Sequence, residues 1–134
     1  MGLRVFLVVG KTPSRATTDL VDERDDRSCV RCGVSLEVAY GSRHHRQLRR
    51  HGDHSPANLV LLCGSGTTGD HGWVHSHPQA ARDVGMIVPS WVAADRAPLY
   101  VARFRQWVLH DGVGNRTVIT GDRAWALRME LGLL

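Results

Sequence analysis

Seven of the eight histidines of this 134-residue chain lie between His44 and His77, close enough in sequence to form a metal site. His71 and His75 are four residues apart, which on a helix puts both imidazoles on one face, where they can share one ion. His44 and His45 are adjacent, so on an extended strand their side chains point to opposite faces. One of this pair could bind the metal while the other accepts a proton from water, because an imidazole pKa of about 6.5 suits that task near neutrality. The alternative is a basic loop whose histidines lie on the surface.

The three cysteines form a second candidate metal site. Cys29 and Cys32 are the ends of a C-x-x-C turn, and Cys63 ends the apolar segment NLVLLC. An odd number of cysteines with this spacing is typical of metal binding or redox chemistry in a reducing compartment, not of a disulfide framework. Structural zinc normally takes four ligands from two turns, and the second turn here runs from Cys63 to Asp70, which is therefore the positional candidate for the fourth ligand. The alternatives are a site that has lost its metal, or one of two histidines as fourth ligand: His54 or His77.

The composition narrows the classes of partner. A chain of 134 residues suits a single domain, and 43% hydrophobic with 22% charged residues is ordinary for a globular protein. There are 17 Lys+Arg against 13 Asp+Glu, and Lys11 is the only lysine, so nearly all of the positive charge is on arginine. Because the planar guanidinium fork suits phosphate, this modest positive balance favours a polyanionic partner.

The sequence also bears on the compartment. No segment approaches the run of about 20 apolar residues that spans a bilayer. The apolar FLVV within the N-terminal MGLRVFLVVGK is too brief for a signal peptide. We therefore expect a soluble, cytoplasmic protein with no membrane partner, whose first residues are either a flexible extension or an edge strand.

The first half of the chain is expected to contain one helix and one strand before the histidines. Ser14 is placed to cap a helix within residues 13–26. The segment 34–42 fits a short strand that is broken at Gly41. The polar and strongly basic segment 43–58 predicts a loop after an initial strand segment.

The rest of the pattern alternates helix and strand. The apolar run 58–63 predicts a buried strand, and 71–85 predicts a helix that Pro78 ends or kinks. A hairpin loop is indicated at 111–115, and the tail 122–134 has helical spacing. Four short strands are expected, at 86–91, 99–104, 106–110 and 116–120.

These elements suggest three parts of the chain. We expect an N-terminal extension at 1–12, a central domain at 13–91 and a C-terminal extension at 92–134 that packs on the same domain, with the seam between Pro89 and Pro98. The tryptophans are expected to pack in the core rather than to stack on bases, since aromatic side chains supply much of the buried area of a small domain. They are Trp73, Trp91, Trp107 and Trp125.

The segments HHR at 44–46, NLVLLC at 58–63 and HGWVH at 71–75 together resemble the HNH endonuclease motif. They are most similar to the small HNH endonucleases encoded by bacteriophages of actinobacteria, and the resemblance covers roughly residues 21–91. It implies an α+β protein with a ββα-metal (His-Me finger) fold, in which two strands and a helix hold one divalent ion. Zinc-ribbon-like cysteine turns and a small β-rich C-terminal extension would complete this fold.

The resemblance also implies a role for each motif residue. His44 matches the metal ligand of the first strand, and His45 matches the general base. Asn58 matches the central asparagine, which holds the intervening loop and so orients the base. His71 matches the final motif histidine, a metal ligand. In the colicin-type DNases of the same superfamily a further histidine one helical turn on is also a ligand, and His75 stands at that position.

Relatives with a zinc-stabilised motif carry a fourth cysteine just before the final motif histidine, where this chain has an aspartate. The structural zinc expected here would therefore be held by Cys29, Cys32, Cys63 and Asp70. Four arginines near the expected base are the candidates for contacts with DNA phosphates, which position a duplex without reading its sequence. They are Arg43, Arg46, Arg49 and Arg50.

The function implied by the resemblance is a metal-dependent endonuclease that nicks or cuts duplex DNA. Its catalytic ion would be Mg²⁺, Mn²⁺, Ni²⁺ or Zn²⁺, in addition to the structural zinc. A phage-encoded enzyme of this kind would act in the host cytoplasm and assist genome packaging, with terminase or other packaging proteins as partners. Two alternatives are a zinc-containing nucleic-acid-binding module without catalysis and an HNH nuclease directed at RNA.

Overall fold

The computed structural model describes residues 12–48 and 53–134. The predictions for residues 1–11, and those for Arg49 and Arg50, lie outside these ranges. The helices and strands of the described part are α2 (Arg15–Arg24), β1 (Gly41–His45), β2 (Leu59–Cys63), α3 (Gly69–Ser76), α4 (Pro78–Asp83), β3 (Leu99–Val101), β4 (Gln106–His110), β5 (Arg116–Ile119) and α5 (Gly121–Glu130), with 3-10 turns at Pro56–Asn58 and Ala94–Arg96. The expected α+β class is confirmed at this level.

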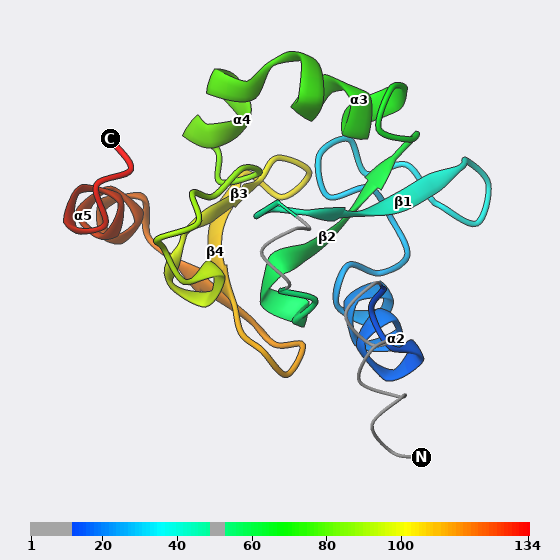
Figure 1. Cartoon of the computed structure of the whole chain (residues 1–134), viewed down its shortest axis with the longest axis horizontal. Helices are drawn as coiled ribbons and strands as arrows, with labels where there is room; N and C mark the ends of the chain where they lie inside the picture. The colour runs from blue at the N-terminus through cyan, green and yellow to red at the C-terminus, as the bar shows by residue number, and fades with distance from the viewer. Residues whose placement is uncertain (1–11, 49–52) are drawn as a thin grey trace.

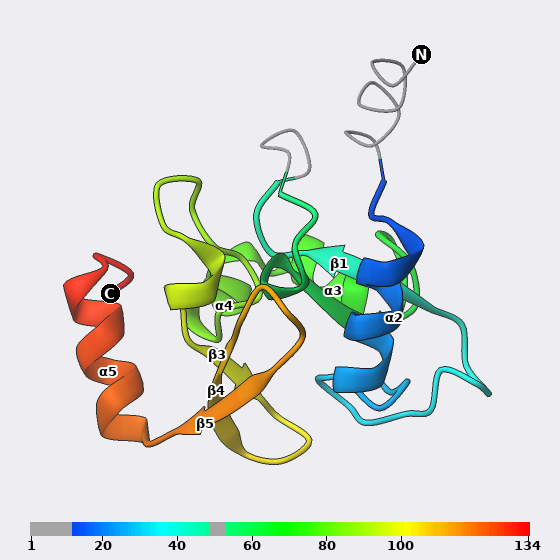
Figure 2. The same cartoon turned by 90° about the horizontal axis from the view of Figure 1, so that it is seen from below.

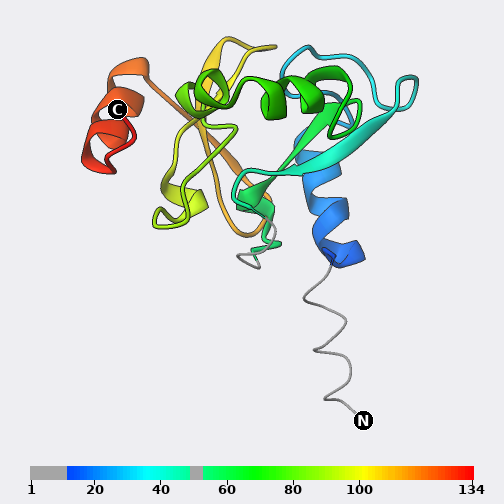
Figure 3. The same cartoon turned by 45° about the horizontal axis from the view of Figure 1, so that its top comes forward.

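Two small antiparallel sheets lie at the centre of the molecule, with α2 and α5 at opposite ends (Figure 1). In the first sheet β1 pairs with β2, and the register puts Gly41 opposite Cys63 and His45 opposite Leu59. The second sheet has the order β3-β4-β5 and leads into α5 (Figure 2). Helix α3 packs against β2, and α4 follows it on the same side of the molecule (Figure 3). The histidine candidates therefore lie on β1 and α3, and the cysteine candidates lie in the turn between α2 and β1 and at the end of β2.

Strand β2 is buried on both faces, which explains its unbroken apolar sequence. Val60 and Leu62 belong to the main core, together with residues of α3 and of the second sheet. Leu59 and Leu61 point the other way and pack on Val21 of α2. The C-terminal segment shares the main core through three strand residues: Leu99, Val101 and Val108.

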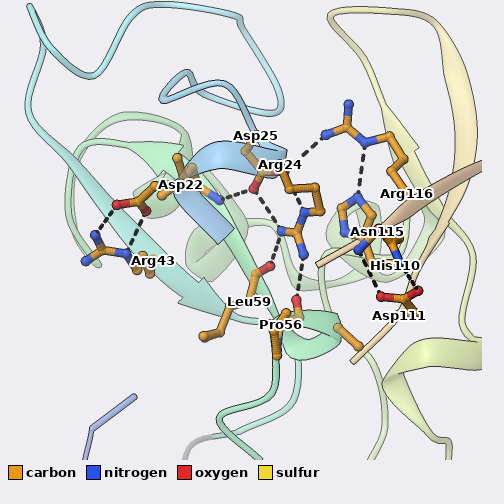
Figure 4. Close-up of polar contacts among 12 residues, drawn as sticks. Asp22, Arg24, Asp25, Arg43, Pro56, Leu59, His110, Asp111, Asn115 and Arg116 are labelled. Atoms are coloured by element: carbon orange, nitrogen blue, oxygen red, sulfur yellow. Dashed lines mark hydrogen bonds and ion pairs between the residues drawn. The ribbon is translucent and has the colours of Figure 1, made fainter. Parts of the chain in front are cut away.

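A buried ionic network joins α2, β2 and the second sheet (Figure 4). The Asp25 carboxylate is buried and accepts hydrogen bonds from Arg24 Nε at 2.8 Å, Arg116 Nη2 at 3.1 Å and the backbone N–H of Leu61 at 3.1 Å. Arg116 Nε donates to His110 Nε2 at 3.3 Å. Burial and the neighbouring arginines lower the pKa of His110, so the ring is neutral and can accept this bond. The network fixes the second sheet against the elements that carry the metal sites.

Several expected elements are present. Ser14 caps α2 by accepting a hydrogen bond from the backbone N–H of Thr17. Pro78 separates α3 from α4 and occupies the first turn of the latter, the position in a helix where its missing N–H is tolerated. Asp111 and Asn115 close the predicted hairpin loop through a backbone hydrogen bond of 3.1 Å. The C-terminal helix is α5.

Two strand predictions are wrong. The segment 34–42 is not a strand, because residues 36–39 turn back and Leu36 packs beneath Gly41, where the first strand begins. The segment 86–91 is irregular, since Val88 donates its backbone N–H to the carbonyl of Arg46 instead of joining a sheet.

The prediction for the tryptophans is only partly right. Trp73 packs against the main core as expected, and Trp107 is half-buried beside Tyr100. Trp91 and Trp125 are not core residues, because 77% and 59% of their surfaces are exposed. Exposed aromatic side chains of this kind cost little, since a folded surface is largely apolar in any case.

Candidate metal sites

Three histidines converge between β1 and α3. His44 comes from the end of β1, and His71 and His75 come from successive turns of α3. One ring nitrogen of each lies within 4.8 Å of the others, and the ring centroids are 5.0–5.6 Å apart. His44 is buried, His71 is half-buried and His75 is exposed, so the cluster opens to solvent on the side of α3. The three expected ligands therefore form one group that could hold a metal ion.

Hydrogen bonds around His44 determine which of its ring nitrogens faces the cluster. Nε2 lies 2.7 Å from the carbonyl oxygen of Met86, which can only accept, so Nε2 carries the proton. The Nδ1 lone pair is left for a metal. Burial lowers the pKa of His44 to about 3, only partly opposed by the bond to Met86, so the ring is neutral as a ligand must be.

Ser42 plays the same part for His71. The Ser42 hydroxyl donates to the carbonyl oxygen of Gly64 at 2.9 Å and lies 2.6 Å from His71 Nδ1. Because a hydroxyl has only one hydrogen, His71 Nδ1 must donate to Ser42, which leaves Nε2 for a metal. No role was predicted for Ser42 from the sequence. Its position two residues before His44 nevertheless puts it on the same face of the strand.

His45 points away from the cluster, as expected for the neighbour of His44 on a strand. Its Nε2 lies 3.0 Å from Nδ1 of His54, and the two rings are nearly perpendicular. His54 therefore lies next to the expected base and is not the fourth ligand of the cysteine site. No local pattern in the sequence connects these two histidines.

Asn58 is buried and fastens the loop that joins β1 to β2. Its Oδ1 accepts the backbone N–H of Gln47 at 2.8 Å, and its Nδ2 donates to the carbonyl of Asp53 at 2.8 Å. Its own carbonyl accepts the backbone N–H of Arg46 at 2.8 Å. One side chain thus holds the loop near both of its ends, close to His45.

Arg46 is not available for phosphate contacts, and that prediction is wrong. Only 1% of its surface is exposed, and its guanidinium donates to four backbone carbonyls: those of Ala57, Gly85, Ala94 and Ala97. Arg43 is partly exposed, but its guanidinium is paired with the Asp22 carboxylate by two hydrogen bonds of 2.6 and 2.9 Å. Alternation along β1 could have revealed the difference, since residues 42, 44 and 46 face inwards.

The second cluster combines the three cysteines with Asp70. Their donor atoms lie within 4.8 Å of one another. Asp70 Oδ2 is 3.2 Å from Cys29 Sγ, and the Cys32 and Cys63 sulfurs are 3.8 Å apart. The backbone N–H of Asp70 also donates to Cys63 Sγ at 3.3 Å. The expected four-donor set is therefore together, and it could hold a metal ion such as zinc.

Two glycines allow the turns that bring these donors together. Gly33 follows Cys32 with a φ of 81°, in the left-handed region that side chains rarely adopt. Gly64 follows Cys63 with the same φ, and any side chain there would collide with the carbonyl of Thr68. The chain thus folds back from Cys63 to the start of α3 within a few residues.

Burial and hydrogen bonds shift the pKa values of all four residues in this cluster. Burial raises the pKa of the three thiols: Cys29, Cys32 and Cys63. Burial also acts to raise the pKa of Asp70, but hydrogen bonds from Cys29, Cys32 and Arg31 outweigh it, so its net pKa is below the ordinary value. A bound cation would act on the thiols in the opposite sense to burial, because it favours their ionised form.

Comparisons with protein-family models, curated proteins and solved structures found no match for this chain. None of the helices in residues 12–48 and 53–134 combines the length and apolar character needed to cross a bilayer. The two clusters and the residues that support them are therefore the features of this chain that bear on its function.

Proposed function

We propose that this chain is a metal-dependent HNH endonuclease that hydrolyses phosphodiester bonds in DNA. The observation that carries the proposal is the convergence of His44, His71 and His75 on one point, with His45 beside them facing the other way. The order of elements, β1, β2 and α3, agrees with the ββα-metal unit of that family. A phage origin and assistance to packaging proteins belong to the proposal only through the family resemblance.

The donor set of the histidine cluster fits a catalytic ion. Catalytic zinc sites typically use three protein ligands and leave a position open, whereas structural sites use four. Imidazole suits Zn²⁺ or Ni²⁺, while Mg²⁺ or Mn²⁺ would need oxygen ligands from phosphate and water to complete its shell. An ion held there would supply positive charge to a scissile phosphate as negative charge grows on it in the transition state.

The protein itself would supply the proton acceptor and its alignment. His45 would accept the proton of the attacking water, for which a general base contributes about 10²–10⁴-fold in rate. His54 lies within hydrogen-bonding distance and would limit rotation of the His45 ring. Asn58 would keep the loop after β1 in place and so preserve the direction of His45.

The cysteine cluster would hold a structural zinc. Three sulfurs and one carboxylate oxygen make a four-donor set, which leaves no position for a substrate. Because Cys29 is buried in the main core, metal at this site would bear on folding and not on chemistry.

The test is cleavage of supercoiled plasmid DNA with Mg²⁺, Mn²⁺, Ni²⁺ or Zn²⁺ by the wild type, His45→Ala and His77→Ala. His77 is a matched control, because it is an exposed histidine just after the same helix and belongs to neither cluster. We expect nicking by the wild type and His77→Ala and a loss of about 10²–10⁴-fold in His45→Ala.

Two outcomes would contradict the proposal. Equal nicking by the wild type and His45→Ala would overturn the role of His45. Plasmid that stays intact with every metal but is retarded on a gel would favour a nucleic-acid-binding module without catalysis. A parallel assay with structured RNA distinguishes a DNA endonuclease from an HNH nuclease directed at RNA. The latter would cleave the RNA and leave the plasmid intact.

A further inference from the structure

Arg31 lies inside the C-x-x-C turn, between the two cysteines that the turn contributes, and its side chain reaches the fourth donor of the cluster. Arg31 Nη1 is 2.7 Å from Asp70 Oδ1. The other carboxylate oxygen, Asp70 Oδ2, faces the cluster at 3.2 Å from Cys29 Sγ. The carboxylate therefore presents one oxygen to the arginine and the other to the metal-binding atoms.

A second contact fixes the guanidinium of Arg31. Its Cζ lies 3.9 Å from the centroid of the Trp73 ring, a distance typical of a cation–π contact. Trp73 follows Asp70 by three residues on α3, so both side chains lie on the same face of the helix. Arg31 thus touches α3 at two points, which restricts both the position and the tilt of its planar group.

We propose that Arg31 is a positioning residue that allows an aspartate to act as the fourth zinc ligand. A carboxylate can bind a metal through one oxygen or two and can rotate about its Cβ–Cγ bond, whereas a thiolate has a single donor atom. By engaging Oδ1, Arg31 leaves only Oδ2 for the metal and sets its direction, as partners of metal ligands commonly do. Its positive charge also offsets the excess negative charge of three thiolates and a carboxylate around a divalent ion.

The competing explanation is that Arg31 merely packs on Trp73 or forms an ordinary surface ion pair. The side chain of Arg31 is 36% exposed and that of Asp70 is 14% exposed, so their attraction alone would add little stability. The two explanations differ in one respect. A packing role is independent of the residue at position 70, whereas the positioning role disappears when position 70 carries a ligand that needs no orientation.

The test is a cycle of full-length variants: wild type, Arg31→Met, Arg31→Lys, Asp70→Cys and Arg31→Met with Asp70→Cys. Zinc affinity is measured by competition with a chromophoric chelator, in a His71→Ala background that removes the other site. Co²⁺ absorption gives a second readout, because its charge-transfer bands report sulfur-bound metal. Arg82→Met, at an exposed arginine on α4, is the matched control.

We expect Arg31→Met to weaken zinc binding by about 10- to 100-fold, Arg31→Lys to restore part of the loss, and Arg82→Met to have no effect. With Asp70→Cys, the same Arg31→Met change should alter affinity by less than about threefold. If that variant does not fold, Asp70→His replaces it, since an imidazole is an accepted zinc ligand and gives Arg31 no carboxylate to hold.

Three results would overturn the role of Arg31. If Arg31→Met weakens zinc binding equally with Asp70 and with Asp70→Cys, Arg31 acts only by packing on Trp73. If Arg31→Met leaves the zinc affinity unchanged, Arg31 has no role in the site. The inference rests on the proposed zinc site, so a wild type that binds neither Zn²⁺ nor Co²⁺ through sulfur would overturn both. Plasmid cleavage does not enter this experiment, so its outcome is separate from that of the proposed nuclease.

Discussion

The two clusters meet at the start of α3, but they differ in the number and type of their donors and in the hydrogen bonds around them. The cysteine cluster has four donor residues, and one of them is buried in the main core. The histidine cluster has three, and each cluster contains one buried and one exposed donor residue. A full set of four donors suits an ion that holds the chain together, whereas a set of three suits an ion that keeps a position open for a substrate. Under the proposed function, the number of donors therefore distinguishes a structural metal site from a catalytic one.

The hydrogen bonds that hold the chain around the two clusters also differ. Around the cysteines, the turns are held by backbone hydrogen bonds, such as those from the N–H of Cys29 to the carbonyl of Val34 and from the N–H of Val30 to the carbonyl of Leu61. Around the histidines, buried hydrogen bonds already fix the framework: Arg46 bonds to four carbonyls, and Asn58 fastens the loop after β1. We therefore expect metal to matter for folding at the first cluster and for activity at the second.

The largest effect is expected from Cys32→Ser, which removes one donor of the cysteine cluster. Cys32 is exposed, so the substitution loses little packing and isolates the contribution of the metal. Structural zinc binds with apparent free energies of about 10–16 kcal/mol in small domains, so we expect a loss of about 5 kcal/mol or more in stability. Thermal unfolding and the zinc content per chain are the measurements, with Val34→Ser in the same turn as control. If Cys32→Ser leaves the zinc content and the melting temperature unchanged, the cysteine cluster does not hold a metal that stabilises the fold.

Arg46→Met should cost about 3–5 kcal/mol of stability, because it leaves four buried carbonyls without their donor. Urea unfolding measures this loss, and Arg82→Met serves as the exposed control. Zinc content should not change. Near-normal stability together with weakened DNA binding would instead return Arg46 to the phosphate contacts that its position in the sequence suggested.

His71→Ala should lower plasmid nicking by at least about 100-fold, because it removes a ligand of an ion that stabilises transition-state charge by several kcal/mol. Its free energy of unfolding should stay within about 1 kcal/mol of the wild type, since it loses one hydrogen bond, the one to Ser42. His77→Ala should match the wild type in both assays. A large loss of stability in His71→Ala would mean that the histidine cluster also holds the fold.

The smallest effect is expected from the pair of Arg43 and Asp22. Breaking this partly exposed ion pair with Arg43→Gln should cost only about 0.2–1 kcal/mol. If Arg43 exchanges its carboxylate partner for a DNA phosphate, Arg43→Gln should also reduce the salt dependence of DNA binding by about one unit of slope. Asp22→Asn is the matched variant, because it frees Arg43 and should strengthen binding. Identical salt dependence in all three proteins would remove Arg43 from the DNA-binding surface.

The features that local sequence patterns predicted were those set by local geometry. The capped helix after Ser14, the buried strand β2 and the pairing of His71 with His75 each depend on residues a few positions apart. The place of Asp70 beside the cysteines was also predictable, because the turn after Cys63 is short.

The features that were missed depend on contacts between distant segments. Arg46 stands in a basic run that resembles a solvated loop, and only the carbonyls of three other segments make it a buried residue. His54 reaches His45 across a loop whose path no periodicity describes. Leu36 folds back under Gly41 and packs against the cluster of Val21, Leu59 and Leu61. This burial outweighs the strand propensity of the segment.

Asp70 and His71 are consecutive residues on α3, so a single peptide bond joins the two clusters. Each residue of a helix turns the chain by about 100°. If one residue were inserted or deleted in the first turn of α3, the donors of one cluster could stay in place only if a donor of the other cluster rotated away. A side chain added at Gly66, in the segment before the helix, would meet no atom within 4 Å, so a substitution there leaves both clusters in place, unlike a change of length in the helix. The two sites therefore depend on the same helical register of α3. Homologues that differ in the length of this turn should have both sites or neither.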